Sequence, residues 1–465
     1  MLFCSLVIGV GISRVAALNP VWVAPAVILA LVFVWRRTWI SLVVVILFGL
    51  SCGMWRGSVY MHRLSQYDAL QFWKISVTAV AMDDGVYNKN QQIEFYANNI
   101  ETDAGQALTG KILVSGFGLN TVFQGDELRI SGKLYPGFGS YQGRMSFSQI
   151  SLVSHHENII TSAKRKFSTG MITALPEPEG SFSLGLLVGQ RATLPNETKQ
   201  DLLMVGLTHI IAVSGYNLTI ILRASKNIFS KYSKRLATLF AVGLIITFLL
   251  LTGLSASIVR AAIVSMLSIF AAYYGRQFKA LNLIMLAAAI TALANPVYLW
   301  SDASWYLSFL AFFGVMVLAP AVALRIHPKL RDHLLIMVAI ESVCAEIMTL
   351  PYVLHQFGQM SLIGLLANVL VVVLIPLAMV LGLIAGLAGM IVPSICGWFA
   401  WPAKILLTYM LDIAHALASL PHIFLQHLAL TTWQMLVLYL VSFGLCTALW
   451  FKNKQESGKI TDRIF

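Results

Sequence analysis

Charged side chains are scarce in this chain. They make up 11% of its 465 residues, whereas a soluble domain carries about 25%. Hydrophobic residues account for 58%, and several apolar runs reach the roughly 20 residues that a helix needs to cross a bilayer. The composition therefore excludes an ordinary soluble protein and predicts an integral membrane protein that has the lipid bilayer as a partner.

Cysteine and metal-binding patterns are also sparse. The five cysteines lie in or beside apolar runs, and their spacing fits neither a disulfide framework nor a CxxC metal site. The sequence His155-His156-Glu157 is adjacent rather than helically spaced, which makes it a poor metal site. No phosphate-binding loop or HExxH motif occurs. We therefore expect no metal, no cofactor and no catalytic residue, and predict that the chain is not an enzyme.

Basic residues outnumber acidic ones, with 32 Lys and Arg against 20 Asp and Glu. The positive-inside rule explains such an excess in a membrane protein, although attraction of a polyanion would use the same residues. The rule predicts that both termini are cytoplasmic. It also assigns to the cytoplasm the basic stretches 36–37, 223–235, 276–279 and 325–331, and the tail 452–465.

The apolar runs divide the chain into segments. We expect N-terminal transmembrane helices over 1–60, a β domain over 68–160, an amphipathic connecting segment over 161–201, and a transmembrane core over 202–451. The predicted spans are 2–18, 21–35, 39–58, 202–222, 236–253, 256–275, 280–294, 304–323, 333–354, 361–392, 397–419 and 431–450. The run 361–392 is long for one span and contains Asn368 and Pro376, so a broken helix with one net crossing is favoured.

Residues 68–160 have a different pattern. Short alternating runs such as KISVTAVAM and DELRISGKLY are bounded by Gly, Asn and Asp. About five short strands with turns at this spacing indicate a small β-barrel of the OB type. The predicted topology puts this domain outside the cytoplasm. The expected fold class is a polytopic α-helical membrane protein with an inserted, extracytoplasmic, OB-like β-barrel domain.

OB domains often bind single strands through aromatics and a basic groove. The segment holds nine acidic and six basic residues, and this net negative charge disfavours a general phosphate-binding surface. A gating or positioning role is therefore kept as an equal alternative to DNA binding. The candidate DNA contacts are Lys111, Arg129, Lys133 and Arg144. At least half of the segment's nine aromatics are expected in the barrel core. The nine are Tyr87, Phe95, Tyr96, Phe117, Phe123, Tyr135, Phe138, Tyr141 and Phe147.

A polar interruption lies inside the apolar stretch 185–223. It contains His209, Ser214, Gly215 and Asn217, and such groups within a bilayer usually mark a pathway or a broken helix. On an intact helix His209 and Ser214 would point about 140° apart, which disfavours a Ser–His nucleophile. A hydrogen-bonded core histidine is the simpler alternative for His209.

Arg260 lies within the predicted span 256–275, where an arginine costs about 2.5–3.5 kcal/mol to insert. It should face protein or water, although a snorkelling arginine remains the alternative. Gly253, Ser257, Ala261 and Ser265 recur at steps of four and predict close helix packing. The predicted substrate path consists of this polar interruption together with Arg260, Asp302 and Asn368.

Three stretches carry a family resemblance. They are GLLVGQRATLP followed by GLTHIIAVSGYNLTI, the segment that begins SASIVRAAIVSMLSIF, and LPYVLHQFGQMSLIGLLANVLVVVLIPL. Together with the order of Arg260, Ser308-Phe309 and Asn368, they make nearly the whole chain resemble the ComEC family of competence proteins, which are inner-membrane DNA-uptake channels.

The resemblance implies a channel that conducts single-stranded DNA across the bacterial inner membrane into the cytoplasm during natural transformation. It also implies partners, namely an extracytoplasmic DNA receptor and cytoplasmic motor or single-strand-binding proteins. Many members continue into a metallo-β-lactamase-like domain, whereas this chain stops at Phe465, so a separate nuclease is expected. The alternative is a small-solute or envelope-precursor transporter, or a membrane-embedded enzyme, on the same scaffold.

Overall fold

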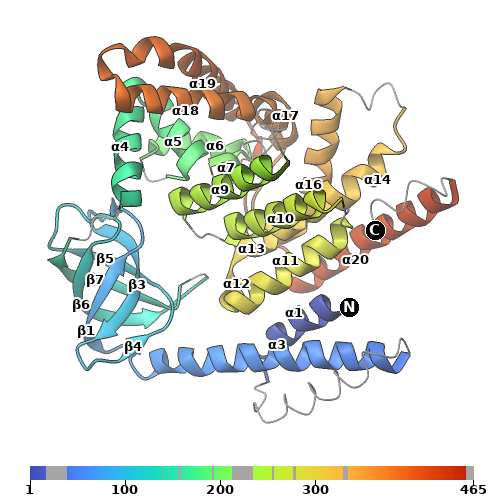
Figure 1. Ribbon diagram of the computed structural model, residues 1–465, viewed down its shortest axis with the longest axis horizontal. Helices are drawn as coiled ribbons and strands as arrows, with labels where there is room; N and C mark the ends of the chain where they lie inside the picture. The colour runs from blue at the N-terminus through green and yellow to red at the C-terminus, as the bar shows by residue number, and fades with distance from the viewer. Residues whose placement is uncertain are drawn as a thin grey trace. The chain divides into compact units, whose positions relative to one another are not determined.

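The computed structural model describes most of the chain. The described residues are 1–16, 39–88, 90–139, 141–155, 159–190, 193–211, 234–253, 256–275, 279–327 and 333–456. They form two compact units, one of Met1–Ala163 with Ala288–Ala303 and the other of Lys164–Ala287 with Ser304–Phe465. Each unit is described by itself (Figure 1). The predicted span 21–35 lies outside the described residues.

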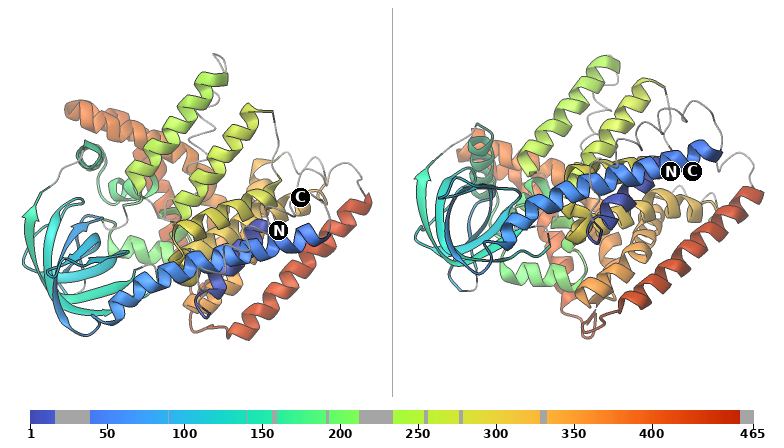
Figure 2. Two further views of the ribbon diagram at one scale, coloured as in Figure 1. Left: turned by 60° about the horizontal axis from the view of Figure 1, so that its bottom comes forward. Right: turned by 90° about the horizontal axis from the view of Figure 1, so that it is seen from below.

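The first unit opens with two closely packed helices, α1 (Leu2–Ile12) and α3 (Trp39–Asp68) (Figures 1 and 2). Small residues recur every fourth position on α3, and small residues in and just after α1 face them; a Cβ on Gly9 or Gly53 would meet the backbone of the other helix. Such small-residue crossings let helix backbones approach where no water drives them together. The six positions are Ser5, Gly9, Ser13, Gly49, Gly53 and Gly57.

The sheet of this unit has five main strands. They are β1 (Lys74–Ala81), β3 (Ile93–Thr102), β5 (Ile112–Phe117), β6 (Glu127–Pro136) and β7 (Gly143–Ser154). The order β1-β6-β7-β5-β3 is completed by a pairing of β3 with β1, so the hydrogen-bonded circuit returns to its first strand. The β5–β7 pair is parallel and the others are antiparallel. The short strands β2 (Val86–Tyr87) and β4 (Ala107–Leu108) pair with β3.

Aliphatic side chains fill the inner face of the sheet. Ala79, Val114, Ile130 and Met145 are fully buried there. The expectation that at least half of the nine aromatics lie in the core is wrong. Alanine, valine, isoleucine and methionine side chains already fill the small interior of the sheet. Only Phe95 is buried, whereas Tyr87, Phe117, Tyr135, Phe138 and Phe147 are exposed.

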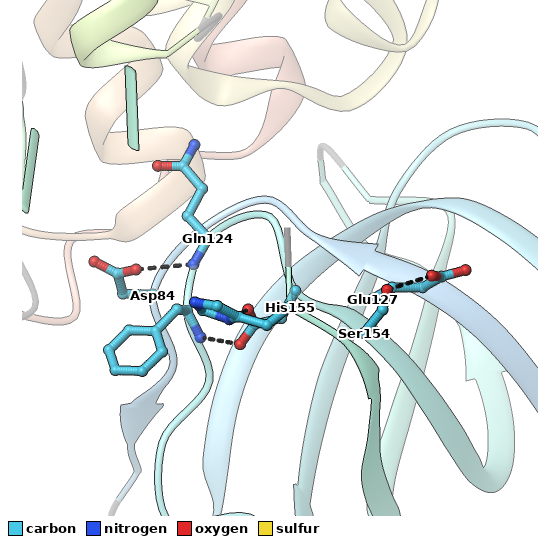
Figure 3. A network of polar contacts seen from close by, with 7 residues as sticks. Asp84, Gln124, Glu127, Ser154 and His155 are labelled. Carbon is cyan, nitrogen blue, oxygen red and sulfur yellow. Dashed lines mark hydrogen bonds and ion pairs between the residues drawn. The ribbon is translucent and has the colours of Figure 1, made fainter. Parts of the chain in front are cut away.

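A polar network fastens the end of β7 to the loop before β6 (Figure 3). Asp126 accepts a hydrogen bond from the backbone N–H of Phe123 at 2.9 Å and contacts the ring of His155. Beside it, the hydroxyl of Ser154 donates to Glu127 at 2.7 Å. These contacts tie His155 and the end of β7 to the start of β6.

The end of one helix and the whole of a short one complete the first unit, and arginines cap both. Arg56 donates to the carbonyls of Leu293 and Ala294 at the end of α11 (Ala280–Ala294), at 2.9 and 3.1 Å. Arg14 donates to the Trp300 carbonyl at 2.8 Å in α12 (Val297–Ser301). Cations near helix C-termini satisfy the last carbonyls and oppose the dipole. The segment 295–303, which lies between two predicted spans, contains this short helix.

The second unit is built around α5 (Glu179–Val188), in which nine of the ten residues are buried. Its main neighbours are α18 (Ile375–Ile391) and α19 (Cys396–Ala418), which lie side by side (Figure 1). The rest of this core includes α4 (Ile159–Ala174), α6 (Asn196–Met204), α7 (Thr208–Ile211) and α17 (Gly364–Val371).

A second group of helices belongs to the same unit. It contains α9 (Lys234–Thr252), α10 (Ala256–Tyr273), α13 (Ala303–Phe313), α14 (Ala319–Ala323), α16 (Leu334–Phe357) and α20 (Thr432–Glu456). A π-helical turn, Gly314–Leu318, joins α13 to α14. In the run 361–392, a 3-10 turn at Val372–Leu374 separates α17 from α18 just before Pro376, whose missing N–H cannot continue the α-helical ladder.

Five described helices are long and apolar enough to cross a membrane. They are Ser41–Asp68, Ala303–Ala323, Leu335–Phe357, Gly364–Ile391 and Thr432–Leu449. The predicted span 397–419 corresponds to α19, which is not among them because residues such as Lys404, Asp412 and His415 lower its hydropathy. Apolar helices together with a separate sheet fit a membrane protein that carries a small sheet domain.

The glycine crossing of α1 and α3 gives a test of the first unit. We expect Gly53→Ala to lower the free energy of unfolding by about 1–3 kcal/mol, because the new methyl group must push the helix backbones apart. Gly243→Ala in α9 is the control, since a Cβ there meets no atom within 4 Å. Thermal unfolding of the two purified variants in detergent checks this, and equal unfolding temperatures would contradict it.

Candidate functional site

The strongest candidate in the second unit is centred on Arg260 of α10. Its residue is only 7% exposed. The Nε–H group donates to the hydroxyl of Ser308 on α13 at 2.7 Å. The Ser257 hydroxyl, one turn earlier on α10, lies 3.1 Å from the same oxygen. Three polar groups from two helices therefore meet inside an apolar region.

Aromatic rings surround the guanidinium group. The Cζ atom of Arg260 lies 4.9 Å from the ring centre of Phe312 and 5.7 Å from that of Phe309. A cation over an aromatic face at this distance is attracted by the ring quadrupole, most strongly away from water. Phe309 in turn packs against Trp305 at 4.6 Å between centroids. The ring cluster fixes the plane of the arginine.

Among the described residues, the charge of Arg260 has no acidic counterpart. In the part of the chain that the structure describes, no carboxylate forms an ion pair with it, and its Nη1 and Nη2 atoms make no hydrogen bond. A buried charge normally costs several kcal/mol unless it is paired. The arrangement therefore suits an anion that another molecule supplies.

The helix that carries Ser308 is irregular close to this point. The π-helical turn begins at Gly314, directly after α13, and Gly314 packs against the backbone of Cys344 and Ala345 on α16. Such π-bulges occur frequently at functional sites. The irregularity begins two residues after Phe312 and five after Phe309.

The predicted small-residue stripe is only partly present in α10. Gly253 does not belong to that helix; it follows the end of α9 with a φ of 86°, a left-handed conformation that glycine adopts without strain. A Cβ there would meet no atom within 4 Å. Ala261 packs against α9, and Ser257 faces Ser308. Ser265 lies on the same helix, half-buried.

Unpaired polar atoms occur in the other half of the second unit. Among the described residues, the buried side-chain oxygens of Asn368 and Ser361 have no hydrogen-bond partner. Ser361 lies beside the backbone of Gly206, whose carbonyl oxygen is 3.0 Å from the Nδ1 atom of His209. His209 itself is exposed at the short helix α7. The contacts thus link predicted residue His209 to the region of α17, which carries Asn368.

The remaining residues of the predicted interruption cannot be placed. Ser214, Gly215 and Asn217 lie outside the described residues, as does most of the predicted span 202–222. The described part of that span consists of α6, a turn at Gly206 and α7. No Ser–His geometry follows from it.

A second candidate lies on the outside of the sheet in the first unit. Phe72 and Tyr135 form an edge-to-face pair with centroids 6.1 Å apart, and the Lys133 ammonium group lies 6.0 and 5.7 Å from their ring centres. Arg144 stands opposite Tyr135 in the β6–β7 register. Phe147 lies in the adjacent bulge. We call Phe72, Lys133, Tyr135, Arg144 and Phe147 the outer aromatic surface.

Two members of this surface have unusual backbone conformations. Phe72 has a φ of 65° and is 59% exposed, and Phe147 has a φ of 55° and is 72% exposed. A bulky residue in the left-handed region costs of order 1–3 kcal/mol and such residues cluster at functional sites. Folding gains little from an exposed ring, so the strain makes Phe72 and Phe147 candidates for contact with a ligand.

Two of the predicted DNA contacts are already engaged elsewhere. Arg129 forms an ion pair with Asp103 at 2.8 Å. The Lys111 ammonium group lies over the ring of Tyr96 at 4.7 Å. Burial lowers the pKa of Lys111, and the carboxylates of Asp302 and Asp83 act in the opposite direction. Asp302, predicted in the substrate path, is thus electrostatically coupled to the sheet.

Metal binding finds no support in the described ranges, where no three His, Cys, Asp or Glu side chains are grouped to hold an ion. The useful residues that the sequence pattern missed are the aromatic residues Phe72 and Phe312, whereas Ser308 entered only as part of the family resemblance. Their roles depend on contacts between distant segments. The left-handed positions of Phe72 and Phe147 have no sequence signal.

Comparison with known proteins matches the C-terminal part of the chain. The family model described as Competence protein matches residues 186–453, more than half of the chain. The chain belongs to the competence protein family. ComE operon protein 3 of Bacillus subtilis (strain 168) is 23% identical over 263 residues, which is 55% of this chain and 33% of that protein. The match thus spans about a third of that competence protein's length. No solved structure matches the chain.

The unpaired oxygen of Asn368 leads to a prediction. We expect Asn368→Leu to raise the thermal unfolding temperature, because it removes a buried acceptor whose desolvation costs about 1–3 kcal/mol. If that oxygen serves a substrate, uptake of labelled DNA should fall in the same variant.

The control is Ser183→Ala, which removes another buried, unpaired oxygen in α5 and should stabilise the protein without changing uptake. A calorimetric scan and an uptake assay on both variants give the comparison. Loss of stability in Asn368→Leu would contradict the assignment.

Proposed function

We propose that this competence protein conducts single-stranded DNA across the inner membrane into the cytoplasm during natural transformation. Family membership supports a role in competence and DNA uptake. The outer aromatic surface is the observation that supports conduction of a single strand. Proteins that bind single strands combine exposed aromatic rings, on which bases stack, with nearby cations.

The strand pairings support an OB-like barrel. Five strands pair in a closed circuit, and the only parallel contact among them joins β5 to β7. A five-stranded barrel of this kind binds oligonucleotides on the faces and loops of its strands. In our proposal the barrel lies outside the cytoplasm, and both chain termini lie inside, as the positive-inside rule favours.

The charge pattern of the barrel favours a phosphate backbone. Lys74 stands directly opposite Lys133 in the β1–β6 register, and like charges in that position repel. No described residue forms an ion pair with Lys74, Lys133 or Arg144. A bound polyanion would relieve the repulsion. The domain is acidic as a whole, but these three cations are concentrated beside the aromatic rings.

The membrane helices would then provide the path. Arg260 and Asn368 bring polar atoms into apolar surroundings, where such groups usually mark a substrate route. Transport needs no bond to be made or broken by this chain, so we propose a channel rather than an enzyme. An outer DNA receptor, a cytoplasmic motor or single-strand-binding protein, and a separate nuclease are the proposed partners.

The proposal predicts that the outer aromatic surface is needed for import. In a deletion strain complemented with variants, Lys133→Gln combined with Tyr135→Ala should lower import of labelled DNA at least tenfold, since stacking contributes about 1–3 kcal/mol per base. Arg129→Gln is the matched control: it removes a cation from the same strand, but one already paired with Asp103.

Protein level must be equal in all strains. Normal import in the double variant would refute the role of this surface, and normal import in the deletion strain would refute the proposed function. Accumulation of a small envelope precursor in the deletion strain, with normal DNA import, would instead favour a transporter of small solutes.

A further inference from the structure

We propose that Arg260 forms a binding site for one phosphodiester group of the passing strand. The inference rests on the proposed function and adds a specific contact to it. The site consists of the guanidinium of Arg260, the hydroxyls of Ser308 and Ser257, and the rings of Phe312 and Phe309.

The hydrogen bonds of Arg260 leave its outer edge available. A guanidinium group has five N–H donors, and Ser308 takes the one on Nε. In the described part of the chain, no acceptor occupies the donors on Nη1 and Nη2. Those two nitrogens form the fork that binds two oxygens of a phosphate in a bidentate manner. A phosphodiester matches this fork because it offers two non-bridging oxygens that share one negative charge.

The surroundings hold the fork in place. Ser308 anchors Nε, and Ser257 supports the Ser308 hydroxyl from the preceding turn of α10. Phe312 and Phe309 stand 4.9 and 5.7 Å from Cζ and restrict the rotation of the group. Pre-organisation of this kind reduces the entropy that a ligand must otherwise offset.

The burial of Arg260 argues against a surface role. A snorkelling arginine extends its charged end to water, whereas this residue is 7% exposed and bonded to a neighbouring helix. An anion must therefore come to Arg260. The described structure contains no carboxylate in an ion pair with it, so a passing phosphate meets no internal competitor.

One fork binds one phosphate at a time, which suits conduction. A pore has to attract its substrate and still release it, so a single weak site is better than a row of tight ones. The same chemistry is offered by the headgroup of a phospholipid, which carries one phosphodiester. The experiment has to separate these two sources.

The first measurement is the salt dependence of DNA binding by the purified full chain in nanodiscs. A labelled thymidine 30-mer is titrated at several salt concentrations. Each neutralised phosphate on a single strand contributes about 0.7 to the slope of log K against log salt. Arg260→Gln should lower the slope by about 0.7, and Arg260→Lys should restore it because the charge returns. Lys404→Gln, which removes an exposed cation of α19, should leave the slope unchanged.

The second measurement locates the strand during import. A photoreactive benzoylphenylalanine at Phe312 should cross-link to labelled DNA in competent cells, and the adduct should be lost in the Arg260→Gln background. The control position is Phe270, an exposed residue on the same helix α10, which should give no adduct. Ser308→Ala should weaken the Phe312 adduct, since the fork loses its anchor.

The outcomes separate the possibilities. An unchanged slope together with an unchanged adduct in Arg260→Gln overturns the site while the proposed function stands. Loss of one tightly bound phospholipid from Arg260→Gln in native mass spectrometry, without change in slope or adduct, assigns the site to lipid and also overturns it. A wild-type chain that neither binds the oligonucleotide nor supports import overturns the proposed function itself.

Discussion

An arginine buried among apolar helices has to be compensated by its neighbours, because the charge has left water. In this chain the compensation for Arg260 comes from one hydroxyl and two aromatic rings of α13. The contact therefore fixes which face of α10 meets α13. The π-helical turn at Gly314–Leu318 directly follows α13. The irregular part of this apolar helix therefore lies close to its contact with Arg260.

Comparison with the other arginines clarifies why this one is unusual. Arg14 and Arg56 also donate to groups within the protein, but their acceptors are carbonyls at helix ends. Those carbonyls need donors in any case, so the two arginines complete the structure of α11 and α12. Among the described residues, the donors on Nη1 and Nη2 of Arg260 have no acceptor. Arg260 therefore differs from Arg14 and Arg56 in its unfilled donors, since all three carry the same charge.

The sequence predicted the class of the protein and the position of its sheet domain because both depend on local patterns. Alternating residues over Lys74–Ala81 and Glu127–Pro136 indicate strands, and apolar runs indicate spanning helices. The outward position of most aromatics was not predictable, because the alternation does not say which face is inside. The short helix α12 was missed because its five residues are too few for a period.

The candidate site was predictable only in its most exceptional members. Arg260 stands out because a charge in an apolar run is rare, and Asn368 for a similar reason. Phe312 does not stand out, because phenylalanine is common in membrane helices. Ser308 entered only through the family resemblance, and its role arises from a contact with Arg260 across 48 residues. Gly253 was misassigned because spacing alone does not show that α9 ends at Thr252.

The pairing of β1 with β6 and of β5 with β7 has a consequence for biosynthesis. Chains emerge from the ribosome N-terminus first, and the circuit of strands cannot close before Ser154 has appeared. Until then the aliphatic faces of β1, β3 and β5 have no cover, and their unpaired edges can associate with other chains. Non-local pairing also slows folding. The nascent sheet domain is therefore most exposed to aggregation until β6 and β7 have been synthesised.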